Sequence, residues 1–378
     1  MEGIHRREAA EAEPRRKRAR VDDVGGGGAV AAAEEGDRLS DLPDDLLEGI
    51  LALLGSRQAV QTSVLSRRWR HLWRGVRSVD IDLREFRARG SARFDSDGME
   101  DFADAILSPA LLCSGPELDS FRLHLDEDGV ATNFQFQRWI RRALRRCPAS
   151  VDIHYRVRTS IDWPPAVTLI PAAATSHIKT LRLFGLRPTV FLGPNEFPVL
   201  EDLHIERCFY GFSTITSSTL KNLAVISPID RDCVRELVLI APSLTSLHLD
   251  HPYGRAHGLR VISARSLASV LDASISMVDT DPANERNRPP NLAKFDFLVS
   301  VSDLLGRLTG VRNLELTGLT ATAMQVYNSE KFPVFPLLKA LLLNDCAMGN
   351  KIILKQAPNL EQLRLHNMPQ VLKKTWFG

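Results

Sequence analysis

Residues 244–249, Leu-Thr-Ser-Leu-His-Leu, set the pattern that organises most of this chain. The pattern is L-x-x-L-x-L, and related copies with other apolar residues begin at Ile178, Leu200, Leu220, Leu244, Leu292, Val311, Leu338 and Leu360. The first four starts lie 22, 20 and 24 residues apart, and the last four lie 19, 27 and 22 residues apart. A degenerate copy at Leu267 and Val270 fills the gap, although Asp272 replaces its third apolar residue. A period of about 20–29 residues is typical of leucine-rich repeats.

Each L-x-L predicts a short strand whose two apolar side chains share one face, because side chains alternate across a strand. Two weaker units precede the array, with strand patterns at 118–123 and 151–153 and an amphipathic helical pattern at 136–144 between them. Stacked units of this kind form one parallel sheet along the inner wall of an arc. We therefore predict an α/β fold in which residues 118–378 form a leucine-rich repeat solenoid with a parallel sheet on its concave face.

The residue between the two apolar positions of each strand should point outward from the core. These outward positions are Arg122, Asp152, Arg182, His204, Ala224, His248, Leu271, Asp296, Glu315, Leu342 and Arg364. Taken singly, each is most simply an ordinary solvent-facing strand residue. Together they mix both charge signs with apolar positions, which suits a protein or peptide surface better than a polyanion. We predict that this row contacts an unknown protein substrate.

Residues 37–82 hold three short helical patterns with more apolar surface than they can cover themselves. Along the first helix the apolar residues fall on two neighbouring stripes, Leu46, Ile50 and Leu53 on one, and Leu47, Leu51 and Leu54 on the other. A helix apolar over that much of its surface is buried on more than one side. A segment of about 50 residues cannot satisfy both stripes, so the second should meet another protein or domain. The alternative is a first helical layer that is wholly buried against the rest of this chain.

Local signals agree with a three-helix unit. Pro43 suits a first helical position, and Asp44 and Asp45 lie near the positive end of the helix dipole. Ser66 is expected to cap a third helix with an aromatic face that includes Trp69. Residues 83–117 have a helical pattern of their own and should link this unit to the repeats.

The stretch LPDDLLEGILALL at 42–54, followed by TSVLSRRWRHLW at 62–73, closely resembles the F-box of plant F-box proteins that carry leucine-rich repeats, including their FBD-type relatives. The resemblance implies that residues 37–82 bind a Skp-type adaptor, and through it a cullin, while the repeats capture a substrate for ubiquitination. It implies adaptor contacts at Leu42, Pro43, Leu46, Leu47, Ile50 and Leu51, with Val64, Leu65 and Trp69 either touching the adaptor or supporting the module.

Residues 1–36 differ in composition from the rest, with many charges, four consecutive glycines and few large apolar side chains. This composition is typical of a disordered tail. The tail holds a compact basic cluster formed by Arg15, Arg16, Lys17, Arg18 and Arg20. We interpret the cluster as a nuclear-import signal, with a solvated charge run as the alternative. The expected location is the nucleus, and the cytoplasm in addition.

Composition and motifs exclude several other functions. The chain has 378 residues, 44% hydrophobic and 25% charged, and its net charge of +2 offers no general attraction to nucleic acid or membranes. No apolar run approaches the ~20 residues of a membrane span. The five cysteines are widely scattered, and His248 and His251 lack further ligands, so we expect no disulfide, metal or cofactor. No hydrolase, zinc-protease or dinucleotide motif occurs, so we expect no catalysis by this chain.

The sequence thus favours a substrate-receptor subunit of a cullin-type ubiquitin ligase, which acts by holding a target close to a conjugating enzyme. A nuclear repeat scaffold outside any ligase is the alternative. A sensor that binds a small ligand together with its target is a third possibility.

Overall fold

The computed structural model describes residues 39, 41–87, 95–108, 117–125, 133–156, 166–167, 175–188, 197–209, 214–226, 236–253, 261–264, 267–279, 292–324, 334–345 and 351–367. The chain divides into two units, Met1–Leu42 and Pro43–Gly378. In the first unit the backbone N–H of Leu42 donates to the carbonyl of Leu39 at 3.4 Å. The second unit holds every helix and strand named below.

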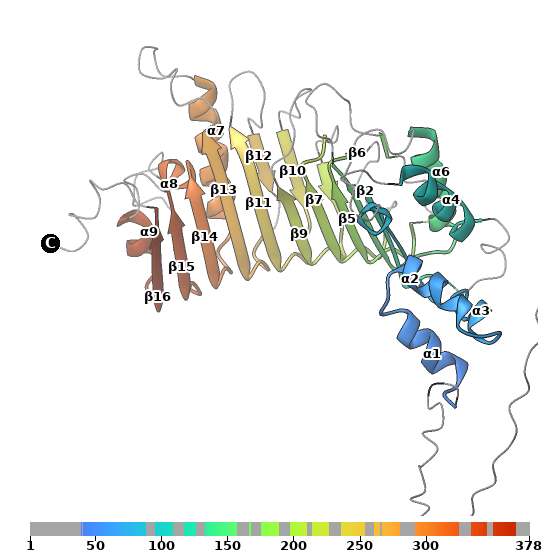
Figure 1. The fold of residues 1–378 in the computed structure, drawn as a ribbon. Helices are drawn as coiled ribbons and strands as arrows, with labels where there is room; N and C mark the ends of the chain where they lie inside the picture. The colour runs from blue at the N-terminus through green and yellow to red at the C-terminus, as the bar shows by residue number, and fades with distance from the viewer. Residues whose placement is uncertain are drawn as a thin grey trace, which may run out of the picture. The chain divides into compact units, whose positions relative to one another are not determined.

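A parallel sheet dominates the second unit (Figure 1). Within the described residues it has eleven strands, which are β1 (Ser78–Asp82), β2 (Ser120–Leu125), β3 (Ser150–Tyr155), β5 (Thr180–Phe184), β7 (Asp202–Glu206), β9 (Asn222–Ile226), β11 (Ser246–Tyr253), β13 (Asp272–Asp279), β14 (Asn313–Gly318), β15 (Ala340–Asn344) and β16 (Gln362–His366). Each strand pairs with the previous and the next in chain order, so neighbours in sequence are neighbours in space.

One face of the sheet is buried and the other is open, because apolar and polar side chains alternate along the strands. In β2 and β3, for example, every second residue is buried and the residues between are half-exposed. The buried side chains form one continuous hydrophobic core that runs from Val79 to Ala357. The parallel sheet and its inward apolar positions confirm the strand prediction for most copies of the pattern.

Helices and two small sheets lie between the strands in sequence, and apolar side chains of α4, α6 and α7 join the core. The helices are α4 (Ser96–Ile106), α6 (Asn133–Leu144), α7 (Leu292–Gly306), α8 (Thr320–Ala323) and α9 (Lys351–Gln356). The small sheets comprise β8 (Thr214–Thr216), β10 (Glu236–Ile240) and β12 (Val261–Ala264), and the pair β4 (Ala166–Val167) and β6 (Arg187–Pro188). The helices predicted within 83–117 and 136–144 are therefore present as α4 and α6.

Two units of the predicted array are wrong in detail. The segment from Leu292 is helix α7 rather than a strand, because its apolar residues continue at helical spacing for 15 residues. Asp296 is therefore an exposed helix residue and is not on the sheet. In the degenerate unit the strand begins at Asp272, so Ser274 replaces Leu271 as the outward residue.

The segment before the sheet contains α1 (Asp44–Leu51), α2 (Ser56–Gln61), the short 3-10 helix η1 (Thr62–Val64) and α3 (Trp69–Leu72). Pro43 is the N-cap of α1 rather than its first residue, and the predicted Ser66 cap is wrong, because Arg68 holds that position for α3 without a side-chain cap. Residues 78–82, which were predicted to belong to the helical module, form β1.

Helix α2 packs against β1, which attaches the helical segment to the sheet. The backbone N–H of Asp80 donates to the hydroxyl of Ser56 at 2.7 Å. A second link is made by Arg57, whose guanidinium donates to the carbonyl of Glu85 in η2 (Leu83–Phe86) and lies 4.3 Å from the ring centroid of Phe86. The sheet therefore begins where the helical segment ends.

Candidate functional site: an apolar surface and a sheet face

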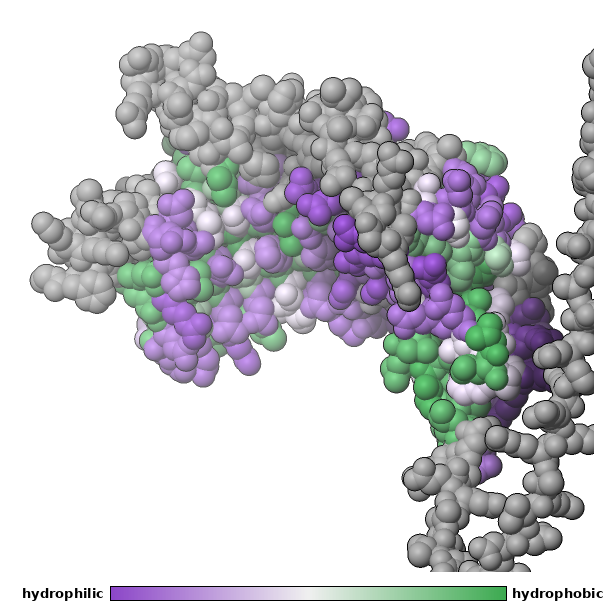
Figure 2. Space-filling model, viewed as in Figure 1, coloured by the Kyte–Doolittle hydropathy of each residue, from purple (hydrophilic) through white to green (hydrophobic). Residues whose placement is uncertain are grey.

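The helical segment exposes a group of large apolar side chains. We define the apolar surface by its five most clearly exposed members, with their exposed fractions: Leu46 (54%), Ile50 (40%), Leu53 (86%), Val64 (85%) and Leu65 (66%). Figure 2 shows hydrophobic side chains gathered over α1 to α3, whereas the open face of the sheet is largely hydrophilic. Contiguous exposed apolar groups of this kind mark interaction sites.

Two residues of the second stripe lie inside the chain, whereas the third, Leu54, is 37% exposed. Leu47 and Leu51 are fully buried, and Trp69 and Leu72 of α3 are nearly so. These residues therefore support the apolar surface and do not form it. The alternative that every apolar residue of this segment is buried against the rest of the chain is wrong.

Charged groups fix the start of α1 against α3. The Arg68 guanidinium donates to Asp44 at 2.6 Å, with both groups near the surface. Burial raises the pKa of Glu48, and the nearby carboxylates of Asp44 and Asp45 raise it further. The acidic first turn predicted from sequence is present beside the positive end of this helix.

The strand register aligns the predicted outward residues on one row of the open sheet face. Paired in order from β1 to β16, this row is Asp80, Arg122, Asp152, Arg182, His204, Ala224, His248, Ser274, Glu315, Leu342 and Arg364. Apart from Asp80, which was not predicted, and Ser274, which replaces Leu271, every member was predicted from the sequence. We refer to it as the central row.

Near β1 the central row holds paired charges. The Arg122 guanidinium donates to Asp80 at 2.8 Å and lies 3.8 Å from Asp82. His124 Nε2 lies 3.4 Å from an Asp152 carboxylate oxygen. Burial raises the pKa of Asp152, but the interaction with His124 and the positive charges nearby outweigh it and lower the pKa. Arg122 and His124 at this end of the face therefore each lie within ion-pair distance of a carboxylate on a neighbouring strand.

An aromatic ladder lies beside the central row, two residues further along each strand. The rings of His124 and His154 lie 5.2 Å apart, and His154 stacks on Phe184 at 3.9 Å with planes 8° apart. The next strand contributes Glu206, which interacts with His204 at 3.2 Å. The ladder was not predicted from sequence, although the alternation of outward positions, extended by two residues, would have found it.

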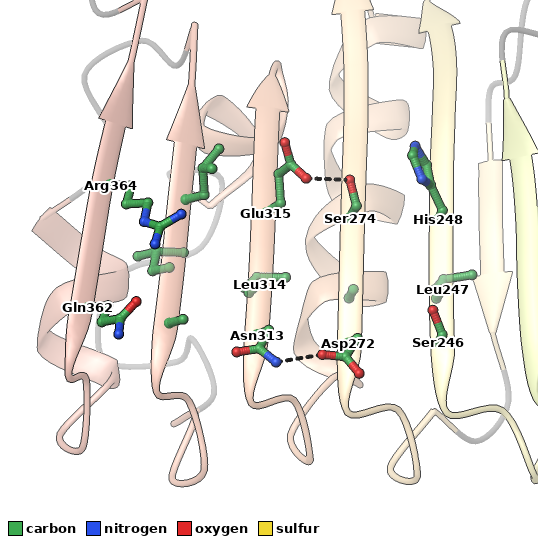
Figure 3. A pocket seen from close by; sticks show the side chains of 14 residues that line it. Ser246, Leu247, His248, Asp272, Ser274, Asn313, Leu314, Glu315, Gln362 and Arg364 are labelled. Atoms are coloured by element: carbon green, nitrogen blue, oxygen red, sulfur yellow. Dashed lines mark hydrogen bonds between the residues drawn. The ribbon is translucent and has the colours of Figure 1, made fainter.

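At the other end, strands β11 to β16 form a hollow of about 450 Å³ on the open face (Figure 3). Its polar lining includes Ser246, His248, Asp272, Ser274, Asn313, Glu315, Gln362 and Arg364, with Ala340 and Leu342 between them. The Ser274 hydroxyl donates to Glu315 at 3.1 Å, and the Asn313 amide donates to Asp272 at 2.6 Å. Figure 3 shows the Arg364 side chain extending from β16 over the neighbouring strand.

In the part of the chain that the structure describes, no group of three His, Cys, Asp or Glu side chains could hold a metal ion. Burial raises the pKa of Cys208 to about 12, so its thiol is neutral and unreactive at ordinary pH. Among these residues no helix is long and apolar enough to cross a membrane. The basic cluster at 15–20 lies outside the described residues.

An apolar helical surface at one end of a polar sheet face defines a protein built for interaction. The F-box domain family matches residues 39–80. The chain is 62% identical over 341 residues to the meiotic F-box protein MOF of Oryza sativa subsp. japonica, covering 88% of this chain and 71% of that protein. It is also 25% identical over 367 residues to an Arabidopsis thaliana F-box/FBD/LRR-repeat protein, covering 88% and 77%, and 25% identical over 362 residues to an Arabidopsis F-box/LRR-repeat protein, covering 86% and 91%. The chain belongs to the F-box protein family.

Proposed function

We propose that this chain is the substrate-recognition subunit of a Skp–cullin–F-box ubiquitin ligase. The observation that carries the proposal is the apolar surface, because it lies within the matched F-box domain and its side chains are exposed among the residues that the structure describes. F-box domains generally bind Skp-type adaptors, and an adaptor would explain why these side chains face solvent. The cullin is then reached through the adaptor, and the chain itself supplies no catalytic step.

The predicted adaptor contacts divide by position. Leu46 and Ile50 belong to the exposed stripe of α1, and Leu53, which was not among the predicted contacts, continues this stripe beyond the helix. Val64 and Leu65 add the second exposed group near η1. We therefore infer that these five residues contact the adaptor directly, together with Leu42 and Pro43 at the start of the module. Leu47, Leu51 and Trp69 act by supporting them.

The sheet suits the capture of a protein target. Its strands follow one another in chain order, and the relatives are named for leucine-rich repeats, which supports a repeat solenoid. Each repeat in such an array contacts its neighbours, so the stack can hold a target at a set distance from the adaptor. Proximity to a recruited conjugating enzyme then raises the effective concentration of target lysines.

The basic cluster Arg15, Arg16, Lys17, Arg18 and Arg20 supports nuclear import as the expected location. Microscopy of a fluorescent fusion with these five residues changed to Ser tests that point. Unchanged nuclear accumulation of this variant would contradict the import signal.

Binding to a purified Skp-type adaptor tests the main proposal. We expect Leu53→Asp combined with Leu65→Asp to weaken adaptor binding by at least about tenfold, because two charges would enter an apolar contact. Leu337→Asp is the matched control, because Leu337 is 49% exposed just before β15, outside the F-box domain. Undiminished adaptor binding by the double variant would contradict the proposal. A stable adaptor complex that never contains a cullin in cell extract would favour the scaffold alternative.

A further inference from the structure

The two ends of the open sheet face differ in whether their charged side chains lie beside a side chain of opposite charge. Near β1, Arg122 and His124 each lie beside a carboxylate of the same face. In the hollow, by contrast, Arg364 has no ion pair or hydrogen bond among the described residues, and Glu315 interacts there with the neutral Ser274 hydroxyl. The lining of the hollow thus presents one guanidinium, Arg364, and two carboxylates, Glu315 and Asp272, whose hydrogen-bond donors among the described residues are neutral.

The strand register fixes the spacing of Glu315 and Arg364. Glu315, Leu342 and Arg364 are paired residues on the consecutive strands β14, β15 and β16. Neighbouring strands lie about 4.8 Å apart, so the backbone positions of Glu315 and Arg364 are separated by about 10 Å. Leu342, half-buried, lies between them. The hollow therefore presents an acidic, an apolar and a basic position in a line that crosses the strands.

An α-helix laid across the strands matches this spacing. Helix residues i, i+4 and i+7 lie on one side and rise about 6 and 10.5 Å along the axis, which is close to one and two strand spacings. In an extended peptide, successive side chains on one side are about 6.6 Å apart. The second such step is about 13 Å from the first residue, which exceeds two strand spacings of about 10 Å. Ala340, which is small, pairs with Asn313 and Gln362 in the adjoining row and leaves space beside Leu342.

We propose that the hollow over β14 to β16 binds a helical segment of the target protein that carries a basic and an acidic side chain seven residues apart, with an apolar residue between them. The basic side chain meets Glu315, the apolar residue covers Leu342, and the acidic side chain meets Arg364. Either charged residue can come first in the helix sequence. The order only decides whether the N-terminus of the helix lies over β14 or over β16. This inference rests on the proposed function, because it takes the open sheet face as the surface that binds the target.

The test measures direct binding of synthetic helices to the full chain by fluorescence anisotropy. The mixed probe is an Ala-based helix of about 16 residues with Lys at i, Leu at i+4 and Glu at i+7, and the acidic probe has Glu at both charged positions. Wild type should prefer the mixed probe. Glu315→Lys should bind the mixed probe about tenfold or more weakly and should now prefer the acidic probe, because both protein positions are then basic.

Asp296→Lys is the matched control, because it makes the same charge change at an exposed position of α7. It should leave the affinity for the mixed probe unchanged. Equal wild-type affinity for both probes, no binding of the mixed probe at roughly 1 mM, or tighter binding of a proline-interrupted peptide with the same side chains would overturn the proposal. Adaptor binding by Glu315→Lys is measured in parallel and should equal wild type, so that failure of the adaptor contact and failure of the hollow are separate results.

Discussion

Asp82 shows how a single residue fixes the turn from β1 into η2. It is buried at the end of β1, and its carboxylate accepts hydrogen bonds from the backbone N–H of Arg84 at 2.9 Å and from the guanidinium at 2.7 Å. Burial raises the pKa of Asp82, but the hydrogen bonds from Arg84 together outweigh it and hold the pKa below its ordinary value of 3.8. The ionised form is therefore the one that stabilises the fold.

We expect Asp82→Asn to lower the free energy of unfolding by roughly 1–2 kcal/mol at pH 7, because charge-assisted hydrogen bonds are lost. The folded pKa lies below the unfolded one, so this stabilisation is present above about pH 4 and disappears as pH falls through the folded pKa. Urea unfolding at several pH values measures the difference. Asp101→Asn, on the exposed side of α4, should have little effect. A wild-type advantage that persists unchanged below pH 2 would contradict this assignment.

At the scale of the elements, the end of β5 depends on backbone conformation. Gly185 has φ +66°, and a Cβ at this position would collide with the carbonyl oxygen of Tyr155. We expect Gly185→Ala to destabilise the fold by about 1–3 kcal/mol, because both the left-handed conformation and the clash with backbone must be relieved. Thermal unfolding measures the change.

Gly49 provides the opposite case, because it lies inside α1 and a Cβ added to it would meet no atom within 4 Å. Gly49→Ala should stabilise the protein by about 0.5–1 kcal/mol, since alanine favours helix. An equal fall in melting temperature for Gly185→Ala and Gly49→Ala would show that the turn after β5 has no special requirement for glycine.

Elements with a complete apolar pattern were predictable from sequence. The copies at Leu200 and Leu338 became β7 and β15 with the expected residues inside, because a shift of one residue would have moved every leucine to the solvent side. The copy at Leu292 failed, because a short apolar run fits a helix as well as a strand, and only packing decides between them. In β13 the inward residue Ala273 is too small to mark the register by hydrophobicity alone.

The candidate site was predictable to the extent that it follows the same alternation. Two predicted positions, Leu271 and Asp296, lie outside the central row because of a wrong register and a wrong element, and one member of the row, Asp80, was not predicted. Sequence could not separate the exposed Leu46 from the buried Leu47, because both stripes of α1 are equally apolar and only the position of α3 decides which is covered. The hollow was not predictable, since it depends on side-chain sizes across five strands.

At the scale of the whole molecule, each strand of the large sheet interacts mainly with the strands on either side of it. Each strand pairs with those before and after it, while one core joins all of them. A disturbance at a central strand should therefore spread in both directions, whereas one at the last strand of the described sheet has a single neighbour to affect. Leu223 in β9 is buried, and Leu363 in β16 is 37% exposed.

We expect Leu223→Ala to cost roughly 2–4 kcal/mol, because it leaves a cavity in the core. The backbone amides of β7 and β11 should both exchange faster with deuterium in this variant, as measured by mass spectrometry of peptides from each strand. Leu363→Ala should cost less than about 1 kcal/mol, since a partly exposed side chain loses less burial, and faster exchange should be confined to β15 and β16. Faster exchange on only one side of β9 would mean that the sheet is divided at that strand, and a target bound at the hollow could not then be held rigidly relative to the adaptor.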